Sequence, residues 1–342
     1  MARKQKTAAQ KAKAKATIQK RVEESRNETV ATIIDMMERG GLDWHKEWSM
    51  DGFTTSDAFA PHNPITGTYY RGMNQMSLAS RIIRDGLNDN RFCTACQAKK
   101  MGWTIKEGAT AYIIEKWKRT TWKTTDADGN EELHSKPTLL SFFYVYSFTD
   151  IDGAPELPKA DERPTREREE LDDLLDALKY TSRCRVLEKV SGEAFYRPLT
   201  DDVTVPMRDQ FTSLQAALRT MLHEMGHSTM HPDACNRTAG GRFGSSDYAF
   251  EELIAELTAL FTASYLCVDL PTEDEDEHKR NHAAYLQSWL KALNNDTSYI
   301  YRAAAKAADA SDYIIDRLTK AHPEYIRDAD TIDAPESDEN AA

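Results

Sequence analysis

The chain has 342 residues, of which 40% are hydrophobic and 29% charged, as in ordinary soluble globular proteins. At about 100–200 residues per domain, this length predicts two domains. No run of about 18 uncharged apolar residues is present that could span a membrane, and residues 1–21 lack the apolar segment of a secretory signal. Five scattered cysteines indicate a reducing compartment. These features exclude a membrane protein, a collagen-like chain and a secreted cystine scaffold, and they predict a cytoplasmic protein.

The net charge of −12 is unevenly distributed along the chain. Residues 1–150 hold 23 basic and 18 acidic residues, whereas residues 151–342 hold 21 basic and 38 acidic ones. The first part is therefore mildly basic and the second strongly acidic. This asymmetry makes the N-terminal part the better candidate for contacting a polyanion.

The N-terminal region begins with a basic tail, residues 1–21, which carries eight Lys or Arg residues and no acid. We expect this tail to be disordered or marginally helical by itself, acting as a solubilising terminus or as a nucleic-acid arm. From Val22 to about Arg39 the apolar residues follow helical spacing, and Gly40-Gly41 ends that helix. Gly72 to Asp85 predicts a second helix. Residues 109–125 and 138–149 predict two strands joined by a turn at Asp128-Gly129.

The C-terminal region is predicted to be mostly helical with a small sheet. Short strands are expected around Ala194–Tyr196 and Val203–Val205, the second offering an edge to an extended peptide. Helices are expected at Leu171–Leu178, from a cap at Thr212 or Ser213 up to Pro232, and at Tyr248–Leu266, Ala283–Leu293 and Tyr301–Leu318. Glu273–Glu277, five consecutive acids, predict a solvated loop. The fold class is α+β, with a basic tail (1–21), a mixed α/β domain (22–152), a linker (153–166), a mostly helical domain (167–322) and an acidic tail (323–342).

The strongest chemical signal is His223-Glu224-Met225-Gly226-His227, an H-E-x-x-H pattern. Two histidines four residues apart share one face of a helix, so their imidazoles can converge on one metal ion. Glu224 then lies beside that ion, where it can accept a proton from a water molecule. Two histidines without a ligand would be costly to bury in an apolar helix; the alternative is a structural pair on a solvated face.

A catalytic zinc needs a third protein ligand, and the helix around residues 250–256 offers acids for that role. Glu252 and Glu256 lie four residues apart and share a face, so we predict Glu252 as the ligand and Glu256 as the group that orients His223 or His227. Glu251 is expected to be an ordinary surface charge. The alternative is that all three acids are surface charges. Zinc is the expected ion, with manganese as the alternative.

Two further features carry weaker signals. His231 lies one helical turn beyond His227, and we favour a helix end or a substrate contact over metal ligation, because histidines eight residues apart on a straight helix span about 12 Å. The pair Cys93-x-x-Cys96 has no second pair or flanking histidine, so two free thiols are expected rather than a zinc or redox site.

The N-terminal region interleaves aromatic and cationic residues in a way that suits single-stranded nucleic acid. Bases stack on rings while cations follow the phosphates, although many of these rings belong equally well to a core. The residues predicted to lie near the DNA are Trp44, Trp48, Tyr70, Arg71, Lys116, Lys118 and Arg119.

These motifs together resemble ArdC-type antirestriction proteins over roughly residues 25–318. In the first half the resemblance lies in Trp44-x-x-x-Trp48, Thr66-Gly67-x-x-Tyr70-Arg71-Gly72-x-Asn74, Gln97-Ala98 and Gly108. In the second it lies in Ala194-Phe195-Tyr196, Asp202-x-x-x-Pro206, the H-E-x-x-H pattern, Glu251-Glu252-Leu253-x-Ala255-Glu256, Ser288-Trp289-Leu290-Lys291-x-Leu293 and Ala303-Ala304. The resemblance implies an N-terminal single-stranded-DNA-binding domain, a zincin-like metallopeptidase domain related to SprT and Spartan proteases, a plasmid or phage origin, and protection of incoming DNA from host restriction.

Three functions remain open at this stage. In the first, zinc held by His223, His227 and Glu252 activates water, and Glu224 passes its proton to the leaving amine. In a second, the protein only coats DNA and its metal site is structural. In a third, it is a DNA-dependent protease of DNA-bound or host restriction proteins; a protease without any DNA role is a weaker variant. A membrane partner is not expected.

Overall fold

The computed structural model describes residues 8–40, 54–125, 131–157, 168–238, 245–270, 276–327 and 332. Its helices are α1 (Ala8–Gly40), α2 (Thr55–Ala58), α3 (Met73–Arg84), α4 (Ala95–Lys100), α5 (Arg168–Thr181), α6 (Leu214–Ser228), α7 (Ser246–Tyr265), α8 (Asp276–Asn295) and α9 (Ser298–Ala321). Its strands are β1 (His62–Asn63), β2 (Thr68–Tyr69), β3 (Phe92–Cys93), β4 (Thr104–Ile105), β5 (Tyr112–Thr125), β6 (Glu131–Ser147), β7 (Ile151–Asp152), β8 (Arg185–Lys189), β9 (Phe195–Arg197) and β10 (Asp202–Pro206). The predicted α+β class is confirmed.

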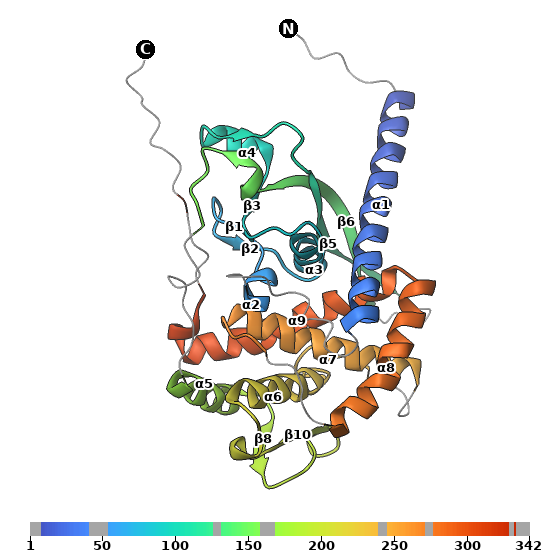
Figure 1. Cartoon of the computed structure of the whole chain (residues 1–342). Helices are drawn as coiled ribbons and strands as arrows, with labels where there is room; N and C mark the ends of the chain where they lie inside the picture. The colour runs from blue at the N-terminus through green and yellow to red at the C-terminus, as the bar shows by residue number, and fades with distance from the viewer. Residues whose placement is uncertain are drawn as a thin grey trace.

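The N-terminal part is built on a long β-hairpin flanked by two helices (Figure 1). Strand β6 lies between β3 and β5, and β5 pairs antiparallel with β6 from Tyr112 to Thr125, with a bulge between Lys116 and Trp117. The helix predicted to begin at Val22 begins earlier: α1 starts at Ala8, so most of the basic tail is helical. The turn predicted at Asp128-Gly129 lies outside the described residues.

The C-terminal part combines helices α5 to α9 with a three-stranded sheet of order β8-β10-β9, against which α6 packs (Figure 1). Strand β10 pairs parallel with β8 and antiparallel with β9. The prediction that Val203–Val205 offers a free edge is therefore wrong, because both sides of β10 already have hydrogen-bonded neighbours. Strand β8 was not predicted, because three of its five residues are charged and it lacks the run of apolar or β-branched residues typical of a strand. The last two residues of the acidic run, Asp276 and Glu277, are helical rather than in a loop, because α8 begins at Asp276. The first three lie outside the described residues.

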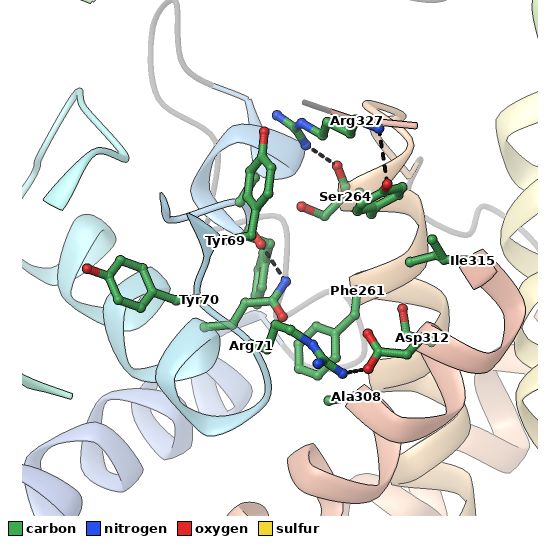
Figure 2. A pocket seen from close by; sticks show the side chains of 14 residues that line it. Tyr69, Tyr70, Arg71, Phe261, Ser264, Ala308, Asp312, Ile315 and Arg327 are labelled. Carbon is green, nitrogen blue, oxygen red and sulfur yellow. Dashed lines mark hydrogen bonds and ion pairs between the residues drawn. The ribbon is translucent and has the colours of Figure 1, made fainter. Parts of the chain in front are cut away.

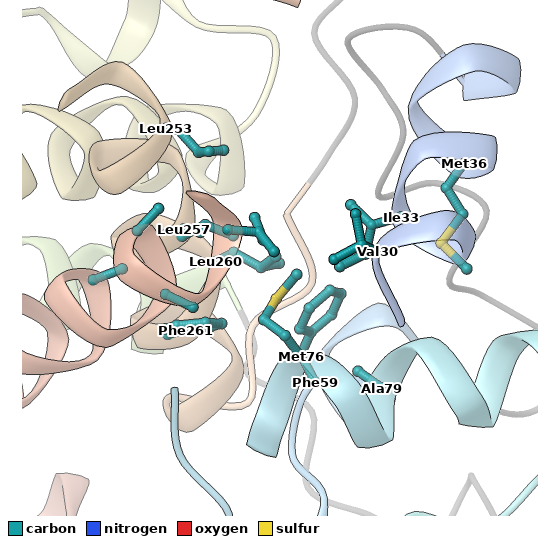
Figure 3. Close-up of a cluster of buried hydrophobic side chains, with 14 of the residues drawn as sticks. Val30, Ile33, Met36, Phe59, Met76, Ala79, Leu253, Leu257, Leu260 and Phe261 are labelled. Carbon is teal, nitrogen blue, oxygen red and sulfur yellow. The ribbon is translucent and has the colours of Figure 1, made fainter. Parts of the chain in front are cut away.

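A hydrophobic core joins the two parts of the chain (Figure 3). The stripe predicted on α1 is buried, with Ile33 and Met37 fully inaccessible to solvent. It packs with α3, which contributes Met76, and with residues of α7 such as Leu257. Burial of apolar area contributes about 25 cal/mol per Å², so this shared core fixes the N-terminal part against α7. Helix α7 in turn packs against α6, the helix that bears the H-E-x-x-H pattern.

A second hydrophobic core packs α5, α6, α7 and the small sheet together. Ser213 caps α6 by accepting a hydrogen bond from the backbone N–H of Ala216, as predicted. The helix ends at Ser228 rather than at Pro232, with Thr229 as its C-cap. Among the described residues no helix has the length and apolarity to cross a membrane.

Candidate metal centre

Helices α6 and α7 pack closely enough to bring their polar side chains together. Gly226 allows this approach, since a Cβ at that position would lie 3.2 Å from the Cβ of Thr258 and 3.3 Å from the Cα of Ala255. Real Cβ atoms rarely tolerate such distances, so a larger residue would separate the helices. The missing side chain therefore lets acids on α7 reach the histidines on α6.

Three ligand atoms converge between the two helices. The Nε2 atoms of His223 and His227 lie 3.1 Å apart, and Glu252 places its two carboxylate oxygens 3.4 Å from the first and 3.6 Å from the second. Ligand atoms at 2.0–2.2 Å from a tetrahedral ion are roughly 3.3–3.6 Å apart. These three residues form the one group of described histidine, cysteine and acidic side chains with metal-binding spacing, and their donor set fits a divalent cation.

The other nitrogen of each imidazole faces a second carboxylate. The Nδ1 atom of His223 lies 3.2 Å from Glu256. This position suits the predicted role of Glu256, which is to orient one of the two histidines. The Nδ1 atom of His227 lies 3.7 Å from Glu251, a residue that the sequence predicts to be a surface charge. Glu251 is in fact buried, with 6% of its surface exposed. Carboxylates in this position orient metal-binding imidazoles and raise their basicity.

Two arginines hold these outer carboxylates in place. Arg219, on α6, lies 3.3 Å from Glu256. Arg237, after α6, donates to both oxygens of Glu251, at 2.5 and 3.2 Å, and also to the backbone carbonyl of Gly226 at 3.0 Å. The bidentate geometry is the strong form of an arginine–carboxylate pair. Neither arginine belongs to the H-E-x-x-H pattern, so the motif alone does not predict them.

The carboxylates change the protonation of the two histidines. Burial is the largest single influence and lowers the pKa of both rings, but the acids together outweigh it. Glu256 and Glu252 raise the pKa of His223 well above its ordinary value, and Glu251 and Glu252 raise the pKa of His227 to about 9. In Glu252, burial raises the pKa, yet hydrogen bonds from the two histidines leave it lowered overall. A cation entering the site therefore displaces protons from the imidazoles.

The remaining predicted residues of this region lie beside the centre. Glu224 is on α6, with 6% of its surface exposed. His231 lies beyond the end of α6, where its Nε2 atom is 3.9 Å from Asp201, and it is not part of the ligand group. Cys93 is buried in β3 and Cys96 is exposed on α4, and both are free thiols.

The predicted DNA contacts do not gather at one place. Lys116 and Lys118 are exposed on β5, and Arg119 lies in the same strand, but its side chain is outside the described part of the chain. Tyr70 packs against the first core, and its hydroxyl donates to the carbonyl of Phe92. Arg71 forms an ion pair with Asp312 of α9 (Figure 2). Trp44 and Trp48 lie outside the described residues.

Comparison with known proteins divides the chain as its fold does. Residues 23–147 match the family model of the N-terminal domain of the anti-restriction factor ArdC, and residues 172–306 match a zincin-like metallopeptidase model. Fold, site and models thus define a zincin-like protein with an ArdC N-terminal domain. The crystal structure of the antirestriction protein ArdC from plasmid R388 superposes with a TM-score of 0.62 and 27% identity, over 86% of this chain and 98% of that one. Its Mn(II)-bound form agrees at 26% identity with the same TM-score. The chain belongs to the ArdC-type antirestriction proteins.

Sequences similar to this chain occur within longer proteins and in a protein of similar length. A DNA primase TraC of Escherichia coli is 30% identical over 295 residues, which are 83% of this chain and 19% of the primase. A second TraC primase of the same species is 32% identical, with 26% of its length matched. The chain therefore spans about a fifth to a quarter of these primases. Protein y4eC of Sinorhizobium fredii is 29% identical over 87% of this chain and 93% of its own.

Proposed function

We propose that this chain is a mobile-element antirestriction protein that binds single-stranded DNA and carries a metallopeptidase site, in the cytoplasm of a bacterial host. The first role is assigned to residues 22–152 and the second to residues 167–322. The observation that carries the proposal is the convergence of His223, His227 and Glu252 with metal-ligand spacing. The matches to the two family models support it.

The three converging residues would hold one divalent cation. Two imidazoles and a carboxylate favour zinc, and manganese is the alternative, since the ArdC protein of R388 is also known with Mn(II) bound. When bound, such an ion supplies Lewis acidity and lowers the pKa of water. Glu256 and Glu251 fix the two rings so that both Nε2 atoms point to the same place.

Glu224 is assigned the general base. It follows a ligand on the same helix turn and is buried, which strengthens its electrostatic interactions with a reacting group. It would accept a proton from the attacking water and deliver it to the leaving amine. His231 is assigned a substrate contact rather than metal ligation, because its partly exposed ring is held by Asp201 outside the ligand group.

The β5–β6 hairpin is the surface that best suits single-stranded DNA. Trp117 and Trp122 are 45% and 42% exposed, which is unusual for side chains that gain so much from burial. Lys116 and Lys118 are exposed on the same strand, and Arg119 lies between them and Trp122. Exposed rings next to cations provide stacking platforms and phosphate contacts without sequence preference. The predicted contacts at Trp44, Trp48, Tyr70 and Arg71 remain part of the proposal.

The test compares peptide hydrolysis and metal content of the intact chain in the presence and absence of oligo-dT. The proposed function predicts metal-dependent cleavage that chelation abolishes. A pure DNA-binding protein would keep its metal and its DNA affinity but cleave nothing. A DNA-dependent protease would cleave a protein bound to DNA only when the DNA is present.

A further inference from the structure

A pocket of about 120 Å³ lies where the N-terminal part meets α7 and α9 (Figure 2). Tyr69 and Arg71, at the end of β2 and just after it, line one side. Phe261 of α7, Asp312 of α9 and Arg327, beyond the end of α9, line the other. None of the residues of the metal centre contributes to this pocket. It is a concave site separate from the metal centre, lined by residues of the N-terminal part, of α7 and α9, and by Arg327.

The floor of the pocket is apolar and small. It is formed by Phe59, Phe261, Ala308 and Ile315, and Phe59, Phe261 and Ala308 are buried. An apolar cavity of roughly 150 Å³ takes up one benzene molecule. A pocket of about 120 Å³ is therefore closer in size to a single six-membered ring than to a fused two-ring system.

The mouth of the pocket carries cations. Arg327 donates to the carbonyl of Ser264 at 2.5 Å, and its guanidinium stands 5.0 Å from the ring centre of Tyr69. Arg71 is paired with Asp312. Among the residues that line the pocket, Arg71, Asp312 and Arg327 are the charged ones, so the lining has one net positive charge. An anion attached to a bound ring would meet a favourable potential there.

We propose that this pocket binds one pyrimidine nucleotide of single-stranded DNA, with the base on the apolar floor and the 5′ or 3′ phosphate at Arg327. The inference rests on the proposed DNA binding and adds to it a site that distinguishes pyrimidine from purine bases by their size. Tyr69 provides a ring beside the base, and stacking of this kind contributes about 1–3 kcal/mol per base. The pairing of Arg71 with Asp312 neutralises the one carboxylate that lines the pocket.

The experiment measures the affinity of the intact protein for short oligo-dT and oligo-dA by fluorescence anisotropy. The wild-type protein is expected to bind oligo-dT at least fivefold more tightly, the lower end of the stacking range. Arg327→Ala removes the phosphate contact and Ile315→Phe fills the floor, so each is expected to abolish the difference. Arg302→Ala is the matched control, since Arg302 lies on α9, pairs with Asp296 and does not line the pocket.

The outcomes separate this inference from the proposed function. Equal affinity for both oligomers, or a preference for oligo-dT that survives both pocket variants, overturns the pocket while DNA binding by the protein stands. Absence of binding to either oligomer refutes the DNA-binding role and the pocket together. The mononucleotide dTMP, added alone, distinguishes the source of the ligand: if it binds in an Arg327-dependent way although the oligomers show no difference, the site serves free nucleotides and the DNA assignment is wrong.

Discussion

Glu251 faces the Nδ1 atom of His227 at 3.7 Å, while Glu252 faces the Nε2 atom of the same ring at 3.6 Å. Consecutive residues of one helix thus contact the two nitrogens of one imidazole. Glu252 points toward the place where the two Nε2 atoms converge, and Glu251 is held by the buried Arg237. This relationship makes the orientation of His227 depend on a residue outside the ligand set.

Glu251→Gln is therefore expected to weaken metal binding without removing a ligand. Loss of a carboxylate that orients a metal-bound histidine typically costs 10–100-fold in metal affinity, and the neutral amide would also leave Arg237 buried without its counter-charge. Competition with a chromophoric zinc chelator measures the effect. Glu324→Gln is the matched control, because Glu324 also pairs with a histidine, His322, but at the exposed surface. An unchanged affinity in Glu251→Gln would show that Glu251 does not orient the ligand.

Glu224→Gln is expected to retain the metal and lose catalysis. A positioned general base contributes about 10²–10⁴-fold to the rate, and glutamine keeps the shape while it cannot accept the proton. Initial rates of peptide hydrolysis and metal content are measured on the same preparation. Retention of the wild-type rate would mean that another group takes the proton, and loss of the metal as well would mean that Glu224 stabilises the site instead.

The sequence was sufficient for the part of the site that depends on helix periodicity alone. His223 and His227 converge because residues four apart share a face, and Glu252 was found because a zinc site with two histidines needs a third donor. The prediction that Glu251 is a surface charge is wrong because α7 is buried on nearly all sides. Its partner Arg237 lies in the segment between α6 and α7, where no periodic pattern marks a residue.

Long-range pairing was the other feature that the sequence could not reveal. The sequence predicts a strand at Val203–Val205 but not its central position in the sheet. Its parallel neighbour β8 is short and rich in charged residues, so the sequence gives no sign of that pairing. The end of α6 was misplaced for a similar reason. Pro232 is a strong stop signal, yet the helix already ends four residues earlier, so His231 leaves the face that His223 and His227 share.

Gly226→Ala is expected to destabilise the fold and the metal centre together. The added methyl group would meet Thr258 and Ala255 at distances that force α6 and α7 apart, and overpacking of this kind costs about 1–3 kcal/mol. The free energy of unfolding is measured in urea, with metal affinity determined in parallel. Gly192→Ala is the control, since a Cβ at Gly192 meets nothing within 4 Å. Equal stabilities of the two variants would contradict the close packing inferred at Gly226.

Trp122→Ala is expected to weaken binding of oligo-dT by about 1–3 kcal/mol, the contribution of one stacked base. The ring is exposed on β5 and contributes little to the core, so folding should be unaffected. Tyr180→Ala provides the comparison, because Tyr180 is 84% exposed on α5, away from the hairpin. If both variants bind oligo-dT as the wild type does, the hairpin is not the DNA surface.

Cys93 and Cys96 are expected to react with thiol reagents at different rates. Burial raises the pKa of the Cys93 thiol to about 11, so it remains protonated at neutral pH, and the thiolate is the reactive form. Cys96 is exposed. Mass spectrometry after brief alkylation at pH 7 should find Cys96 modified and Cys93 intact, with Cys93 becoming reactive only as the pH rises toward 11 or the fold opens. Rapid modification of both would contradict the burial of Cys93.

The most direct test of the account is the metal stoichiometry of the intact chain, determined by elemental analysis after zinc or manganese is added to stripped protein and excess ion is removed. The account predicts one ion per chain for the wild type and for Glu224→Gln, and none for His223→Ala or Glu252→Ala. A wild-type chain that retains no ion, or an Ala variant that retains the full amount, would contradict the assignment of His223, His227 and Glu252 as the metal ligands.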